Sequence, residues 1–176
     1  MIKVTLKDGS VKEFPAGISA YEAAKEISTG LARNACAAKI NGKNADLRDT
    51  LNEDCELEIL TFDDEYGKRT FRHTASHIMA QAVKRLYPHA KLAIGPAVDD
   101  GFYYDFDVET KFTPEDLAKI EAEMKKIVKE DINLERSYKS RNEAVEFFKE
   151  KNEPYKVELA EDIPEGKDIS FYTQGE

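Results

Sequence analysis

The sequence has 176 residues, 41% of them hydrophobic, which is enough for one ordinary domain or two small ones. Its 35 acidic and 26 basic residues give a net charge of -9, which argues against a protein whose affinity for nucleic acid comes from bulk positive charge. There is no apolar run of membrane-spanning length and no signal-peptide core, so we expect a cytoplasmic protein with no membrane partner. The two cysteines, Cys36 and Cys55, give no disulfide framework, which fits a reducing compartment.

Residues 1–62 predict a small β-grasp domain like that of ubiquitin. A strand hairpin turns at Asp8-Gly9, and the capping box at residues 19–22 starts a helix that Gly30 is placed to end. Two further strands are expected around Asn41-Gly42, and residues 55–60 alternate between apolar and polar side chains. The order of hairpin, helix and further strands is typical of this fold.

Residues 63–68 are polar and contain a glycine, so we expect a linker there, followed by a second domain over residues 69–176. Its fold class is predicted to be α+β, with a long helix packed on an antiparallel sheet. The expected helices cover about 70–87, from Thr113 onward, and 140–151. The expected strands cover 92–94, 102–106, 134–139, 156–159 and 169–172.

The stretch from Tyr66 to Val98 contains no acidic residue, although it holds six basic residues and all three histidines. We interpret this as a surface that receives an anionic partner. Five basic residues near its helix either steer phosphates or form a solvated face: Lys68, Arg69, Arg72, Lys84 and Arg85. Because the net charge is -9, we expect the binding of any nucleic acid to be weak and sensitive to salt.

His73 and His77 are four residues apart on the long predicted helix, so their Cβ atoms should be about 5–6 Å apart. Helical periodicity places them opposite an apolar stripe and beside Gln81 and Lys84. The stripe consists of Phe71, Ala75, Ile78, Met79, Ala82, Val83 and Leu86. The histidine pair is either a solvent-facing feature or one wall of a cleft in which two imidazoles perform acid–base chemistry.

A zinc site is the alternative interpretation of this His-x-x-x-His pair. Zinc needs a third and usually a fourth protein ligand, and both cysteines lie in the first domain. Thr74 also occupies the position where a His-Glu-x-x-His metalloprotease has its glutamate. The sequence therefore favours acid–base chemistry, and zinc binding stays open as the less favoured reading.

Three motifs in the second domain resemble one family when they are taken together. They are His73-Thr-Ala-Ser-His77, Leu86-Tyr-Pro-His89, and Ile94-Gly-Pro followed by Gly101-Phe-Tyr-Tyr-Asp105. In this order, behind a β-grasp module, they resemble the N-terminal half of bacterial threonyl-tRNA synthetases, in which a TGS domain precedes an editing domain. The resemblance covers essentially the whole chain.

The resemblance implies that the second domain hydrolyses serine wrongly attached to threonine tRNA. It implies catalytic roles for His73, His77 and Lys156, and a substrate-binding role for Tyr104 at the acceptor end of tRNA(Thr). The family completes this pocket with a Cys-x-x-x-His element that is not in this sequence, so we expect an incomplete editing domain. No metal or other cofactor is expected in this chain. ATP, magnesium and zinc are implied for the family's catalytic domain, and a homodimer is implied for the full-length enzyme.

Two other functions remain as alternatives. TGS domains also occur in regulatory proteins and GTPases, so the chain would then be a non-catalytic module that binds RNA or protein. A zinc-binding protein is the second alternative, based on the His-x-x-x-His pair alone.

Overall fold

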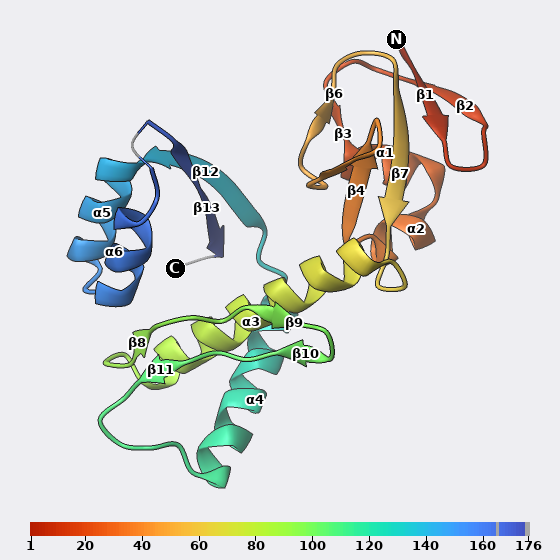
Figure 1. Cartoon of the computed structure of the whole chain (residues 1–176). Coiled ribbons are helices and arrows are strands. Elements are labelled where there is room, and N and C mark those ends of the chain that lie inside the picture. The colour runs from red at the N-terminus through yellow and green to blue at the C-terminus, as the bar shows by residue number, and fades with distance from the viewer. Residues whose placement is uncertain (165, 175–176) are drawn as a thin grey trace. The chain divides into compact units, whose positions relative to one another are not determined.

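The computed structural model describes residues 1–164 and 166–174, and the chain divides into two compact units, Met1–Thr74 and Ala75–Glu176. The division falls inside one long helix, α3 (Glu65–Leu86) (Figure 1). Among the described residues, no helix is both long enough and apolar enough to cross a membrane.

The first unit has the predicted β-grasp fold, in which helices pack on a five-stranded sheet in the order β2-β1-β7-β4-β5. The central strands β1 and β7 are parallel, and the other neighbours are antiparallel. The short strands β3 and β6 pair separately. The strands are β1 (Ile2–Leu6), β2 (Val11–Phe14), β3 (Ile18–Ser19), β4 (Ala37–Ile40), β5 (Lys43–Ala45), β6 (Thr50–Leu51) and β7 (Cys55–Leu60).

Helix α1 (Ala20–Ile27) begins at the predicted capping box, in which Ser19 and Glu22 satisfy each other's backbone N–H groups. It buries three alanines, of which Ala20 and Ala23 lie in one core with Val4 and Phe14. The prediction that Gly30 ends this helix was wrong. The chain leaves α1 at Ser28, whose hydroxyl accepts from a backbone N–H of a second helix, α2 (Thr29–Asn34), and Gly30 lies inside that helix.

Helix α3 starts earlier than predicted, so residues 65–68 are helical although we expected a linker over 63–68. The cause is a turn at Asp64, whose carboxylate accepts from the Thr61 N–H at 2.9 Å and whose carbonyl accepts from the Lys68 N–H at 2.8 Å. Helix α3 ends just before Pro88, as predicted. The domain boundaries themselves stay a prediction.

In the second unit a long irregular hairpin follows α3. Its base pairs β8 (Lys91–Leu92) with β11 (Phe106–Asp107), and its tip pairs β9 (Ala97–Val98) with β10 (Gly101–Phe102). The predicted strands 92–94 and 102–106 are therefore only partly regular. Between base and tip lies Gly95-Pro96, where proline has no N–H to donate and an aromatic ring covers the glycine.

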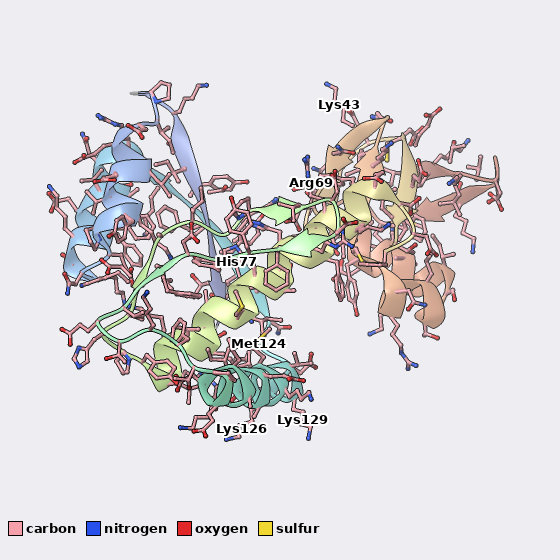
Figure 2. The ribbon with its side chains drawn as sticks, turned by 60° about the horizontal axis from the view of Figure 1, so that its bottom comes forward. Lys43, Arg69, His77, Met124, Lys126 and Lys129 are labelled. Carbon is pink, nitrogen blue, oxygen red and sulfur yellow. The ribbon has the colours of Figure 1, made fainter. Side chains whose placement is uncertain are left out.

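Helix α3 shares a hydrophobic core with α4 (Pro114–Glu130) and with Phe106 of the hairpin. Ala82, Val83, Ala90, Ile120 and Ile127 are buried in this core. In both views the hairpin runs along α3 (Figures 1 and 2). The unit is therefore α+β, with helices combined with antiparallel strands.

The last part of the chain pairs β12 (Leu134–Ser140) with β13 (Asp168–Gln174) and carries two helices beside this pair (Figure 1). Helix α5 (Arg141–Glu150) starts at the predicted capping box of Ser140. The prediction of a strand over residues 156–159 was wrong, because these residues lie in helix α6 (Pro154–Glu161). Pro154 occupies the first helical position, where its fixed φ favours a helix start.

Candidate functional site

His73 and His77 lie one turn apart on α3, as predicted, and His77 is in the middle of the helix (Figure 2). His73 is exposed and His77 is half-buried. Although His73 is exposed, the protein around its ring is dense enough for desolvation to lower the pKa of the imidazole below 6.5. At neutral pH this ring is therefore uncharged and able to accept a proton.

The buried face of α3 is broader than the predicted apolar stripe. Ala82 and Val83 are fully buried as expected, but Ser76 and Ala80, which lie nearer to the histidines, are buried too. Phe71 was wrongly included in the stripe. It is 53% exposed and packs edge-on against Phe62, with ring centroids 5.2 Å apart. The covered face extends toward the histidine side, which explains why His77 is half-buried.

Tyr104 lies in the irregular part of the hairpin rather than in a strand. Its ring covers Gly95 so closely that a Cβ there would lie 2.1 Å from Tyr104 Cδ2. The ring also stacks on Phe106, with centroids 4.9 Å apart and planes 19° from parallel. Burial, followed by the negative charge of Glu153, raises the pKa of the Tyr104 hydroxyl. This hydroxyl therefore stays protonated and available as a donor.

Lys156 projects from the first turns of α6, half-buried, with its ammonium group over the Phe148 ring at 5.6 Å. Burial lowers the pKa of Lys156, because a charged ammonium loses hydration in this environment. Glu153 opposes that effect and Lys84 adds to it. The structure thus brings Tyr104 and Lys156 within electrostatic reach of one carboxylate.

That carboxylate, Glu153, was missed by the sequence analysis. Glu153 is 5% exposed and precedes α6, yet its side chain makes no cap to that helix. One oxygen pairs with Lys84 Nζ at 2.5 Å and the other accepts from the Leu92 N–H at 3.1 Å. Lys84 Nζ also donates to the Ala90 carbonyl at 2.9 Å. Glu153 therefore ties the start of α6 to α3 and to β8.

The five basic residues of the predicted surface differ in their partners. Arg85 makes a bidentate pair with Glu130, at 2.8 and 2.9 Å, so both Arg85 and Lys84 are committed to carboxylates. Lys68 and Arg72 lie over the Phe62 ring. Arg69 is exposed (Figure 2). This exposed arginine lies toward the N-terminal end of α3, where it is accessible to phosphates.

The side-chain amide of Gln81, one turn after His77, is buried, and neither its oxygen nor its nitrogen has a hydrogen-bond partner among the described residues. A hollow of about 260 Å³ lies over the start of α6, and Glu153 is in its lining. Within residues 1–164 and 166–174, no group of three His, Cys, Asp or Glu side chains is placed to hold a metal ion.

The comparisons with known proteins agree with this fold. Residues 2–61 match the TGS domain family. Over all 176 residues the chain is 63% identical to a threonine–tRNA ligase of Acetivibrio thermocellus and 62% identical to one of Clostridium novyi. The chain matches the N-terminal region of the threonine–tRNA ligases. It spans 28% of the length of these two relatives.

A third relative, the threonine–tRNA ligase of Caldanaerobacter subterraneus, is 61% identical over 98% of the chain. The identity therefore extends well beyond the TGS domain, through α3, the hairpin and the segments that carry Tyr104 and Lys156. The family resemblance stated from the His73–His77, Ile94-Gly-Pro and Gly101–Asp105 motifs is confirmed.

Proposed function

We propose that this chain is part of an ATP-dependent threonine–tRNA ligase and carries its TGS domain together with most of a proofreading domain that hydrolyses Ser-tRNA(Thr). The observation that carries the proposal is 63% identity to such a ligase over the whole chain. Such a site is needed because serine lacks only the methyl group of threonine, and one missing methylene changes binding by only about 1–3 kcal/mol.

The proposed reaction is hydrolysis of the ester that joins serine to the terminal ribose of the tRNA. His73 suits the role of general base, because its lowered pKa keeps it neutral at pH 7. A water molecule loses a proton to this imidazole, or to the Cys/His pair implied by the family, as its oxygen attacks the ester carbonyl. The ester C–O bond then breaks, and the ribose hydroxyl leaves with a proton.

His77 and Lys156 are proposed to position the ribose and to stabilise the negative charge that develops on the ester oxygen. Tyr104, whose hydroxyl stays protonated, is proposed to stack on or donate to the terminal adenosine. No metal takes part in this scheme, so we expect a chelator to leave the deacylation rate unchanged. ATP, magnesium and zinc would be bound by regions of the ligase outside this chain.

The test is deacylation of seryl-tRNA(Thr) by this chain and by a version extended some tens of residues to include the Cys-x-x-x-His element. We expect the extended protein to be the active one, and His73→Ala to slow it by about 10²–10⁴-fold. The matched control is His89→Ala, because His89 is an exposed histidine just beyond the same helix.

Two results would contradict the proposal. An extended protein that does not deacylate seryl-tRNA(Thr) would favour a non-catalytic TGS-type module. Equal rates for the His73→Ala and His89→Ala variants would remove His73 from the reaction.

A further inference from the structure

Glu153 is the N-cap residue of α6, but its carboxylate does not cap the helix. An acidic side chain at this position usually accepts from the first N–H groups of the helix. Glu153 makes no such bond and turns inward instead, where it is 5% exposed. A buried charge persists only when its partners offset the loss of hydration, so the partners of Glu153 indicate its role.

These partners come from two other elements of the second unit. Lys84 of α3 reaches one carboxylate oxygen at 2.5 Å, and the Leu92 N–H of β8 donates to the other at 3.1 Å. A neighbouring bond, from Lys91 Nζ to the Asn152 carbonyl at 2.9 Å, ties β8 to the same turn. The start of α6 is thus held to the helix and to the base of the hairpin.

Lys156 and Tyr104 are the residues that this arrangement controls. Lys156 follows Glu153 by three residues, so both lie on one side of the first turn of α6. Tyr104 belongs to the hairpin whose base Glu153 holds, and it feels the same negative charge. Of the described charged groups, Glu153 and Lys84 are those that act on Lys156, with opposite signs.

We propose that Glu153 is the positioning residue of this pocket: its buried carboxylate fixes Lys156 relative to the Tyr104 hairpin, and its single negative charge is shared between the ammonium groups of Lys84 and Lys156. The inference rests on the proposed function only for the assignment of Lys156 and Tyr104 to the site. Glu153 touches no reacting atom and acts through these two side chains.

The test measures the ionisation of Lys156 directly and needs no tRNA. The folded chain is labelled briefly with acetic anhydride at a series of pH values, and mass spectrometry gives the acetylation rate of Lys156, since only the neutral amine reacts. Glu153→Gln keeps an acceptor for the Leu92 N–H but removes the charge. We expect the pKa of Lys156 to fall further, and its labelling at pH 8 to become at least about threefold faster, because one pKa unit corresponds to a tenfold change in neutral amine.

Lys84→Met is the second variant and should act in the opposite direction. Without the Lys84 ammonium, Glu153 acts on Lys156 alone, so labelling of Lys156 should slow. Glu158→Gln is the matched control, because Glu158 is an exposed glutamate on the same helix. We expect this control to leave the labelling of Lys156 unchanged.

The proposal is overturned if Glu153→Gln leaves the labelling of Lys156 unchanged or slows it, since a merely loosened pocket would return Lys156 to water and raise its pKa. If Glu153→Gln does not fold, Lys84→Met decides, and unchanged labelling in that variant refutes the proposal. Deacylation is measured separately. If seryl-tRNA(Thr) is not hydrolysed but the acetylation rates of Lys156 change as expected in the two variants, the proposed function is wrong and the role of Glu153 is still supported.

Discussion

Replacing Gly95 by alanine should displace Tyr104 without altering its side chain. A Cβ at position 95 would lie 2.1 Å from Tyr104 Cδ2 and 2.4 Å from Cε2, whereas ordinary contacts begin near 3.4 Å. The ring must therefore move by at least about 1.3 Å. Such a movement breaks its stacking on Phe106, where the centroids are 4.9 Å apart.

Overpacking of this kind costs about 1–3 kcal/mol of unfolding free energy. A displacement of about 1 Å in a positioned group reduces the rate of a reaction by roughly 10²-fold. Urea denaturation of this chain measures the first quantity, and deacylation by the extended protein measures the second. In the titration of Gly95→Ala, the pKa of Tyr104 should also fall toward its ordinary value, because the ring loses its burial.

Gly101→Ala is the matched control, since Gly101 lies in the same hairpin and a Cβ there meets nothing within 4 Å. We expect it to change the stability by less than about 0.5 kcal/mol. The double variant with Tyr104→Ala isolates the clash, because most of the cost of Gly95→Ala should disappear once the ring is gone. Equal stability of Gly95→Ala and Gly101→Ala would show that the clash does not occur. The same loss of stability from Gly95→Ala when the Tyr104 ring is absent would show that the ring is not its cause.

Three further predictions concern stability and are measured by urea denaturation. Gly67→Ala should lower the unfolding free energy by about 1–3 kcal/mol, because its Cβ would lie 2.0 Å from a backbone carbonyl oxygen. Gly30→Ala, inside α2, should instead raise it by about 0.4–1 kcal/mol. A less stable Gly30→Ala than Gly67→Ala would contradict the packing around these two glycines. Ile127→Ala should cost about 2–5 kcal/mol and the adjacent, 62% exposed Val128→Ala less than about 0.5, so similar values would exclude the α3–α4 core. Because the pKa of His73 is lowered, the folded state binds fewer protons than the unfolded state, and stability should be lost as the pH falls below 6.5. The His73→Gln variant should therefore lose less stability between pH 7 and pH 5 than the unaltered chain. Equal losses would show that the His73 ring is not desolvated.

The helix starts were predictable from the sequence because their determinants are local. The capping boxes beginning at Ser19 and Ser140 operate within one helical turn, and both are formed in the structure. The capped start at Thr113 is formed in the same way. The β-grasp order followed from turn residues and alternation, which also act over short distances.

The wrong predictions concern segments in which a specific contact, not revealed by the periodicity of the sequence, decides the structure. Residues 156–159 alternate in hydropathy, yet Pro154 and the anchored Glu153 start a helix there. Phe71 has helical spacing with the core residues but packs on Phe62. The role of Glu153 depends on the Leu92 N–H, 61 residues away in the chain, and a lone acid before a proline carries no signal of such a partner.

The parallel pairing of β1 with β7 has a consequence for the synthesis of this chain. The first strand, Ile2–Leu6, lies beside the last strand of its sheet, Cys55–Leu60, so the two halves of the sheet stay apart until residue 60 has left the ribosome. At a translation rate of about 5–20 residues per second, the backbone N–H and C=O groups on the β7-facing edge of β1 lack their partners for several seconds. The nascent N-terminus is therefore most open to wrong pairing during that interval, and slower translation between the exit of residue 14 and the exit of residue 60 would prolong it.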